Sequence, residues 1–171
     1  MTLQIPSITK TSVSNFIIRK ADPNDVTLIL DFIRQLAVYE KMPNEVVAEE
    51  EVLSEFLFCD KPFAHVVIGE YEGEPVGFAL FFTNFSTFLG KTGLYLEDLY
   101  VKPAFRKQGM GKIMLSFLGK LALDRNCGRF EWACLNWNTP AIDFYKKHGS
   151  EPMNDWKVYR LTGEALENFA S

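Results

Sequence analysis

Hydrophobic residues recur along the chain at two spacings, which predict alternating strands and helices. Short apolar runs predict strands at residues 16–19, 63–70, 75–83, 93–101, 129–135 and 156–161. Apolar residues three and four positions apart predict helices over residues 22–41, 49–58, 110–121, 138–149 and 163–169. Residues 71–74 are predicted as a hairpin turn and residues 84–93 as a loop. This order of elements implies an α/β layered fold with a mixed central β-sheet flanked by helices.

The ends of the chain differ in character. Residues 1–15 are rich in Ser and Thr, carry Lys10 as their only charged side chain, and are expected to form a poorly ordered arm. That stretch lacks the basic start and apolar middle of a secretion signal. No repeat or linker interrupts residues 16–171, so a single domain is expected there.

Composition narrows the class of protein. The 171 residues are 47% hydrophobic and 23% charged, which excludes disorder for most of the chain. A formal net charge of −4 argues against a nucleic-acid partner, and no apolar run approaches the roughly 18 residues needed to span a membrane. Three cysteines without a CxxC pair, and two histidines outside any cluster, predict a cytoplasmic protein without a metal.

One segment between a strand and a helix carries most of the chemical information. It runs Arg106, Lys107, Gln108, Gly109, Met110, Gly111, Lys112. Its glycines allow close approach to the backbone, while the helix start offers free N–H groups and a positive dipole end that suit a pyrophosphate. The alternative is a tight turn with a capping glycine. A P-loop is excluded because Ile113 follows Lys112, and a dinucleotide fingerprint because Met114 replaces its third small residue.

With its neighbours, this segment resembles the acetyl-CoA signature of the GNAT acetyltransferases. The resemblance extends to residues 35–40, 94–101 and 136–145, and covers about residues 16–161. Within the superfamily, it is similar to the spermidine/spermine, diamine and thialysine N-acetyltransferase branch. The resemblance implies acetyl-CoA as co-substrate, a small amine as acceptor and a homodimer in which C-terminal strands meet.

The resemblance also implies a set of coenzyme contacts beyond the glycine turn. Backbone groups of a splayed strand would face the pantetheine arm, with the Leu99 N–H as candidate oxyanion donor. A following strand and the start of a later helix would complete the site. The positions involved are Leu99, Tyr100, Val101, Glu131, Trp132, Ala133, Asn138, Thr139, Pro140 and Ala141. For Asn138, capping of the helix is the alternative role, and both roles can hold at once.

Amine acetylation needs a proton acceptor, because an alkylammonium with a pKa near ~10 is no nucleophile at pH 7. Glu97 and Asp98 are adjacent acids in an apolar strand, where strict alternation would place them on opposite faces unless a bulge intervenes. Glu97 is expected to accept the amine proton through water and Asp98 to hold a cation; a solvated edge position is the alternative. Taken alone, Tyr145 would be interpreted as a buried core residue, but the resemblance implies that it is the general acid.

On the amine side, the resemblance implies Tyr39, Glu40, Ser86 and Phe88 as binding residues. Polyamine acetyltransferases carry an Asp where Ser86 stands, so a small diamine or diamino acid is favoured over spermine. Cys134 has no activating partner in the sequence, which favours direct attack in a ternary complex over an acetyl-cysteine. Two alternatives stay open: a protein or peptide N-acetyltransferase, and a non-catalytic acetyl-CoA-binding module.

Overall fold

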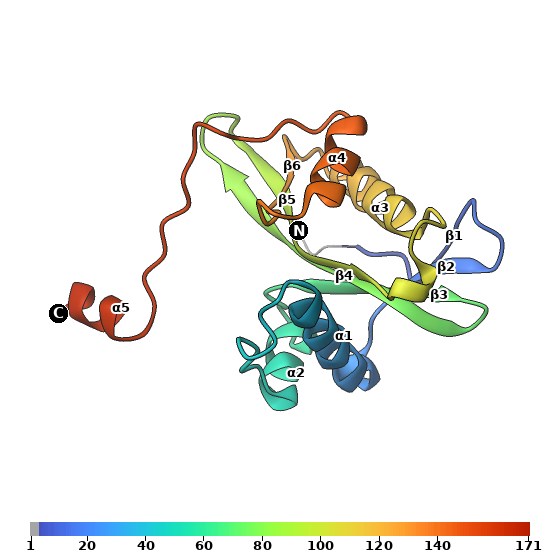
Figure 1. Cartoon of the computed structure of the whole chain (residues 1–171), viewed down its shortest axis with the longest axis horizontal. Coiled ribbons are helices and arrows are strands. Elements are labelled where there is room, and N and C mark those ends of the chain that lie inside the picture. Colours follow the sequence, from blue (N-terminus) through green and yellow to red (C-terminus); the bar gives the residue numbers. More distant parts are fainter. Residues whose placement is uncertain (1–3) are drawn as a thin grey trace. The chain divides into compact units, whose positions relative to one another are not determined.

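The computed structural model describes residues 4–171, which divide into a larger unit up to Ala133 and a smaller one from Cys134 onward. The larger unit holds a six-stranded sheet in the order β1-β2-β3-β4-β5-β6 (Figure 1). Its strands are β1 Ile8–Lys10, β2 Phe16–Lys20, β3 His65–Tyr71, β4 Glu74–Ser86, β5 Lys91–Val101 and β6 Phe130–Trp132. All neighbours are antiparallel except β5 and β6, so the predicted mixed α/β sheet is confirmed.

Helices cover both faces of this sheet (Figure 1). One face carries α3, Met110–Asp124, and the other carries α1, Val26–Tyr39, with α2, Glu50–Phe58. Two short 3-10 helices, η1 Pro23–Asp25 and η2 Pro103–Phe105, lead into α1 and toward α3. Asp22 caps η1, because its side chain accepts the Asn24 N–H at 2.8 Å.

Each face has its own apolar core. The predicted stripe of α3 is buried, with Met110, Met114 and Leu118 at most 1% exposed. The core under α1 is built around Phe32, whose ring stacks on Phe78 with centroids 5.5 Å apart. These two layers fix β5 between α1 and α3.

A β-bulge in β5 interrupts the alternation of its side chains. Leu80 pairs with Asp98 but Phe81 pairs with Leu96, so Glu97 is the additional residue. Leu96 packs in the core on the α3 side, and Leu99 returns to that core three residues later. The bulge therefore turns Asp98 toward the face that α1 covers, and it is the irregularity that would change strict alternation of Glu97 and Asp98.

Three predicted boundaries in the larger unit need correction. Residues 84–93 are not a loop: β4 and β5 pair as far as Ser86 with Lys91, leaving a hairpin turn at residues 87–90. The strand predicted at 129–135 is reduced to β6, because β5 pairs with it over only three residues. The arm expected at residues 1–15 contains strand β1, whose three residues are too few to give a visible pattern.

The smaller unit contains α4, Thr139–Lys147, and α5, Gly163–Ala170, at the positions predicted. Gly149 follows α4 with a φ of 85°, the left-handed conformation that commonly ends helices. The strand predicted at residues 156–161 is wrong for this structure. Those residues are not assigned as a strand, and no strand among residues 4–171 pairs with them.

Candidate active site

The glycine turn begins α3, and its two glycines are present for different reasons. Gly109 has a φ of 85°, which other residues rarely adopt, so the turn itself requires glycine there. Gly111 has no such requirement, since an added Cβ would meet only the Val101 Cγ2 atom at 3.9 Å. A glycine in the first turn of a helix costs about 1 kcal/mol relative to alanine. An alanine would therefore fit at position 111 without a clash inside the protein.

Arg106 lies against aromatic rings as well as the backbone. Its Nε donates a hydrogen bond to the Val101 carbonyl at 2.8 Å. Its guanidinium carbon lies 4.5 Å from the ring centre of Tyr39 and 5.4 Å from that of Tyr100. The residue thus connects the glycine turn with the end of α1, while Lys107 and Lys112 flank the turn.

The second half of β5 is open on the side of β6. Pairing with β6 stops at Leu96, one residue before the bulge. The Val101 carbonyl accepts from Arg106, so it points away from β4, and alternation along a strand gives the Leu99 N–H the same direction. The backbone groups of Leu99 and Val101, predicted to face the pantetheine arm, are therefore left without a neighbouring strand within residues 4–171. Those of Tyr100, predicted to do the same, face β4 instead.

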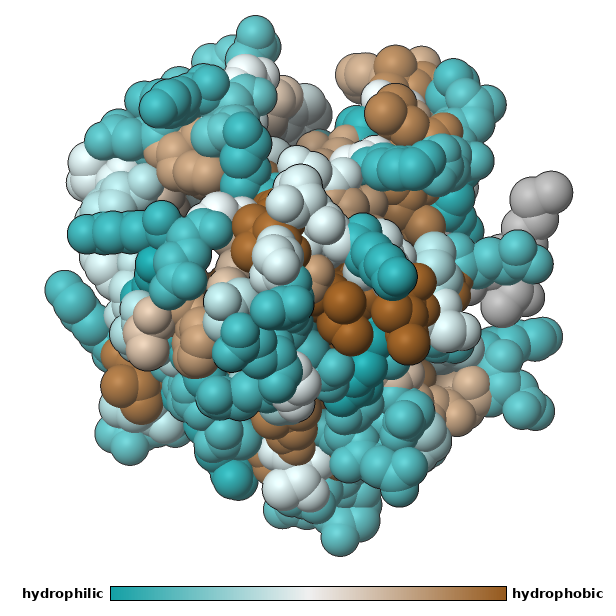
Figure 2. Space-filling view, turned by 90° about the vertical axis from the view of Figure 1, so that its right-hand side faces the viewer, coloured by the Kyte–Doolittle hydropathy of each residue, from teal (hydrophilic) through white to brown (hydrophobic). Residues whose placement is uncertain are grey.

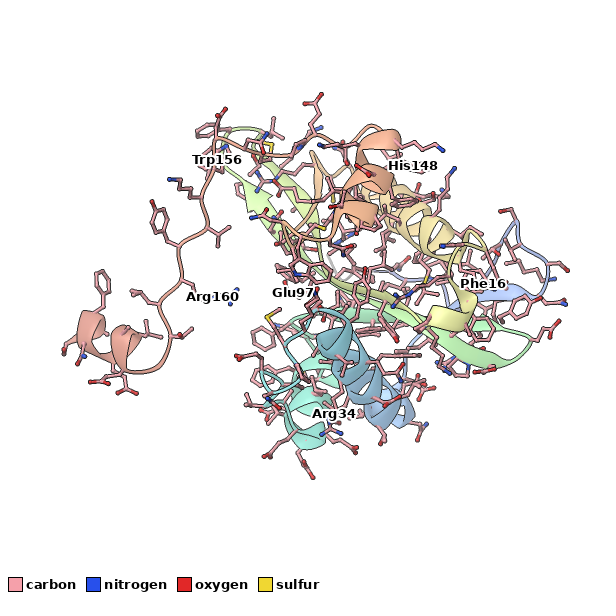
Figure 3. All side chains as sticks on the ribbon, in the orientation of Figure 1. Phe16, Arg34, Glu97, His148, Trp156 and Arg160 are labelled. Carbon is pink, nitrogen blue, oxygen red and sulfur yellow. The ribbon has the colours of Figure 1, made fainter. Side chains whose placement is uncertain are left out.

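Three acids gather where the bulge passes the end of α1. Glu97 is exposed, and Figure 3 labels it beside the end of that helix. Burial raises the pKa of Asp98 to about 6, and the negative charges of Glu97 and Glu40 add to this effect. Burial also raises the pKa of Glu40. An ammonium group would relieve this mutual repulsion, so the arrangement suits a cationic substrate.

Glu131 on β6 is held by two residues that the sequence pattern did not single out. The Asn84 amide donates to its Oε2 at 3.1 Å, and Arg129 Nε forms an ion pair with the same oxygen at 2.9 Å. Gly93 lies beneath them, and an added Cβ would meet the Asn84 Oδ1. In the sequence, only Gly93 could have indicated this close packing. Its partners, Asn84 and Arg129, lie in other parts of the chain.

Ser86 and Phe88 lie at the hairpin between β4 and β5. Ser86 is 5% exposed, and its hydroxyl accepts the Leu89 N–H at 3.3 Å. Phe88 is 93% exposed. Six residues of β4 separate Ser86 from Leu80, the partner of Asp98, which amounts to about 20 Å of strand. The structure therefore does not bring these two predicted amine contacts to the acids.

The predicted residues of the smaller unit lie around α4. The Asn138 carbonyl accepts from the N–H groups of Ala141 and Ile142, both at 3.0 Å, which begins the helix. Tyr145 lies in the second half of the helix, and its ring packs edge-on against Phe144 with centroids 5.6 Å apart. Thr139 and Pro140 form the first turn.

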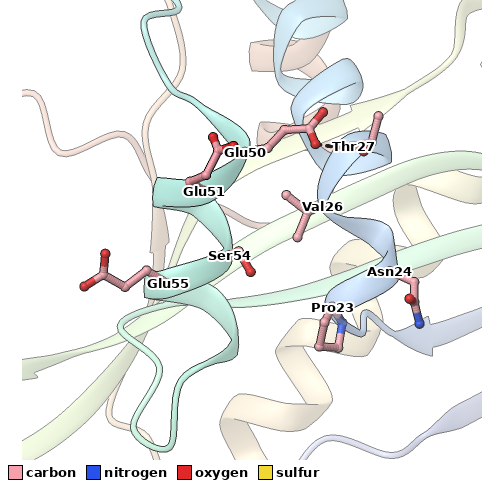
Figure 4. Close-up of a pocket in the computed structure, with 8 residues that line it drawn as sticks. All are labelled: Pro23, Asn24, Val26, Thr27, Glu50, Glu51, Ser54 and Glu55. Atoms are coloured by element: carbon pink, nitrogen blue, oxygen red, sulfur yellow. Dashed lines mark hydrogen bonds between the residues drawn. The ribbon is translucent and has the colours of Figure 1, made fainter.

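A groove elsewhere in the larger unit does not coincide with these residues. It has a volume of about 690 Å³ and lies between the start of α1 and α2 (Figure 4). Glu50 on its wall accepts a hydrogen bond from Thr27 at 3.1 Å. The lining residues are Pro23, Asn24, Val26, Thr27, Glu50, Glu51, Ser54 and Glu55.

Surface and composition features add little that points to another class. On the face shown in Figure 2, hydrophobic side chains form separate patches among hydrophilic ones. No helix within residues 4–171 is both long enough and apolar enough to cross a membrane. In the same residues, no three His, Cys, Asp or Glu side chains lie close enough to hold a metal ion.

Known proteins are similar to this chain in sequence and in fold. A model of the acetyltransferase (GNAT) family matches residues 32–150. Thialysine N-epsilon-acetyltransferase from Sus scrofa is 37% identical, covering 92% of this chain and 99% of its own. L-ornithine N5-acetyltransferase NATA1 from Arabidopsis thaliana is 31% identical, covering 88% of this chain and 86% of its own. An integron cassette protein from the mobile metagenome of V. cholerae has the same fold, with a TM-score of 0.77 at 23% identity, covering 92% of this chain and 99% of its own.

The chain belongs to the acetyltransferase (GNAT) family. It is an N-acetyltransferase of that family, whose members use acetyl-CoA as co-substrate. The resemblance in the glycine turn and its neighbours is confirmed by these matches.

Proposed function

We propose that this enzyme acetylates a primary amine of a small diamine, polyamine or diamino acid by direct attack in a ternary complex. The observation that carries the proposal is the group of acids Glu40, Glu97 and Asp98 at the bulge, beside the open edge of β5. Relatives named for thialysine and ornithine acetylation support an acceptor with a second polar group near the amine.

The start of α3 fits the pyrophosphate of a coenzyme. Its first N–H groups have no partner within the helix, and the Gly111 position leaves the space beside the backbone open. Lys107 and Lys112 supply positive charge near the turn. When bound, acetyl-CoA would supply an acetyl thioester, whose carbonyl carbon is the electrophile.

The proposed chemistry divides the proton transfers between two residues. Glu97 accepts, through water, the proton that the ammonium must lose, while Asp98 and Glu40 hold the cation in place. The nitrogen lone pair then forms the C–N bond as the C–S bond breaks, and the Leu99 N–H donates to the carbonyl oxygen as it gains negative charge. Tyr145 donates its hydroxyl proton to the departing thiolate sulfur, as the family resemblance implies.

The proposal also concerns the size of the amine acceptor. Ser86 stands where polyamine members of the branch carry an Asp, but the structure buries it about 20 Å along β4 from the acids, so the preference rests on the relatives named for thialysine and ornithine acetylation. A diamino acid or a short diamine is therefore preferred over spermine.

A homodimer in the cytoplasm is part of the same proposal. Residues 156–161 are assigned to no helix or strand, and Trp156, Val158 and Tyr159 are 70%, 91% and 89% exposed. An exposed segment that pairs with no strand within residues 4–171 supports docking against a second copy. Analytical ultracentrifugation of the chain, with and without residues 156–171, would test it.

Thiol release from acetyl-CoA is the first test. Thialysine, ornithine, lysine, putrescine and spermidine would be compared at equal concentration, together with a panel of peptides. A tenfold advantage for a diamino acid or short diamine, about 1.4 kcal/mol in the transition state, supports the proposal. The same advantage for spermidine contradicts the preference for a diamino acid or short diamine. Turnover of peptides alone points to a protein acetyltransferase, and coenzyme binding without any turnover points to a non-catalytic module.

A further inference from the structure

Arg106 joins three elements that the proposed reaction uses separately. It follows η2, in the connection from β5 to α3, and its Nε is fixed to the Val101 carbonyl of β5 at 2.8 Å. Its guanidinium lies over the ring of Tyr39, the last residue of α1, at 4.5 Å. The contact therefore bridges the coenzyme turn and the amine-side end of α1.

The rings beneath the guanidinium are themselves fixed. The Tyr100 hydroxyl donates to the Gln35 Oε1 at 3.0 Å, and the Tyr100 ring packs on Phe32 at 6.0 Å. Tyr39 directly precedes Glu40, whose charge contributes to the raised pKa of Asp98. A displacement of the Tyr39 ring would therefore also move Glu40 and change the electrostatic environment of the acids that are proposed to hold the amine.

The guanidinium also has hydrogen-bonding capacity left. Within residues 4–171, only its Nε donates a hydrogen bond, so the terminal nitrogens can reach toward an anion. A cation–π contact and a charge-assisted hydrogen bond to phosphate are of similar strength. Because Nε stays bonded to Val101, an anion that accepts from the terminal nitrogens would hold the guanidinium more firmly over the Tyr39 ring.

We propose that Arg106 is a positioning residue that couples the coenzyme turn to the amine pocket through Tyr39. A phosphate at the turn fixes the guanidinium, the guanidinium fixes the Tyr39 ring, and Glu40 is held at the distance that favours an ammonium. Coenzyme binding then raises amine affinity, and reciprocity requires the amine to raise coenzyme affinity by the same factor. The coupling rests on the proposed function, since it uses the same two sites.

Four variants separate coupling from mere structural support. Tyr39→Leu removes the ring under the guanidinium, and Tyr39→Phe restores it. Arg106→Lys keeps the charge but cannot stack flat on the ring while donating to Val101. Tyr71→Leu is the matched control, because its ring packs at 6.1 Å on Phe105, the neighbour of Arg106, without contacting the guanidinium.

The measurement is calorimetric titration of thialysine with and without saturating coenzyme A. We expect coenzyme A to lower the dissociation constant of thialysine about fivefold or more in the unmodified enzyme. That ratio should persist in Tyr39→Phe and Tyr71→Leu and fall below twofold in Tyr39→Leu and Arg106→Lys. Thermal unfolding would verify that all four variants are folded at the assay temperature.

Two results would overturn the coupling. One is a ratio below twofold in the unmodified enzyme, and the other is an undiminished ratio in Tyr39→Leu. Thiol release with thialysine is measured in parallel and reports on the proposed function independently. Acetylation without coupling would remove the role of Arg106 and leave the acetyltransferase activity standing.

Discussion

Asp98 on β5 and Glu40 at the end of α1 lie close enough for the charge of Glu40 to raise the pKa of Asp98. Burial of Asp98 is the larger cause, and together with the charges of Glu97 and Glu40 it brings the pKa to about 6. A protein that gathers acids in this way loses stability at neutral pH. The arrangement is therefore better explained by a bound cation than by folding.

Replacing Asp98 should make the enzyme more stable and less active. The folded pKa lies above the ordinary value of 3.8, so the folded state holds the extra proton between about pH 4 and 6 and the penalty is complete above pH 6. Asp98→Asn should raise the free energy of unfolding at pH 8 by on the order of 2 kcal/mol, with no gain at pH 3.5. It should also raise the KM for the amine. Urea unfolding at the two pH values checks the first effect.

Glu97→Gln is the control for that experiment. Glu97 is exposed, but its charge adds to the raised pKa of Asp98, so Glu97→Gln should raise the free energy of unfolding at pH 8 by less than Asp98→Asn does, while lowering turnover. A loss of stability in Asp98→Asn at pH 8 would show that the carboxylate has a stabilising partner and would contradict the repulsion described here.

Much of the fold was predictable because the apolar pattern repeats over long elements. The boundaries of α1, α2 and α3 were predicted to within a few residues, and the adjacent acids Glu97 and Asp98 already indicated an irregular strand. The three residues of β1 carry too little pattern. The strand predicted at residues 156–161 failed because alternation alone does not supply a pairing partner.

The site was predictable only where a local motif marks it. The glycine turn could be located from Gly109 and Gly111, and the sequence context pointed to a phosphate. The contact of Arg106 with Tyr39 could not be predicted, because the two residues lie 67 positions apart in the chain. Only the packing of α1 on the sheet joins them. The burial of Ser86 was missed for a similar reason, since the length of the β4–β5 hairpin depends on pairing.

An ion-pair network at the start of α1 should control stability in acid. Arg19 donates to both oxygens of Asp25, at 2.6 and 2.8 Å, and to Glu70 at 2.6 Å. Burial would raise the pKa of Asp25, but hydrogen bonds from Arg19 and the Asp22 N–H outweigh it and leave the pKa lowered. The stabilisation is therefore present above pH 4 and is lost as pH falls through the lowered pKa.

Asp25→Asn should therefore cost about 2 kcal/mol of unfolding free energy at pH 7, and less than that at pH 2. Asp124→Asn is the matched control, because the pair of Asp124 with Lys120 is exposed and should contribute little. Chemical unfolding at pH 7 and pH 2 measures both. Equal losses in the two variants would mean that the buried network adds nothing beyond an ordinary surface pair.

Tyr145→Phe should separate chemistry from binding. The variant keeps the ring that packs against Phe144 and removes only the hydroxyl proposed as the proton donor. We expect kcat to fall by about 10²–10⁴ while the dissociation constant for coenzyme A stays within twofold. Stopped assays of thiol release and calorimetry provide the two numbers, and Tyr159→Phe, at an exposed position, serves as control. Full turnover in Tyr145→Phe would remove the assigned acid.

Gly111→Ala should stabilise the fold and weaken the coenzyme site. The added Cβ meets only the Val101 Cγ2 at 3.9 Å, an ordinary contact, so helix propensity should raise the free energy of unfolding by about 0.5–1 kcal/mol. Gly119→Ala lies later in the same helix, has no neighbour within 4 Å of its added Cβ, and should stabilise by a similar amount. Only Gly111→Ala should raise the dissociation constant for coenzyme A, by tenfold or more, because only there does the methyl group enter the space assigned to the coenzyme. If both variants bind coenzyme A as tightly as the unmodified enzyme, the glycine at position 111 does not serve the coenzyme and the pyrophosphate must lie elsewhere.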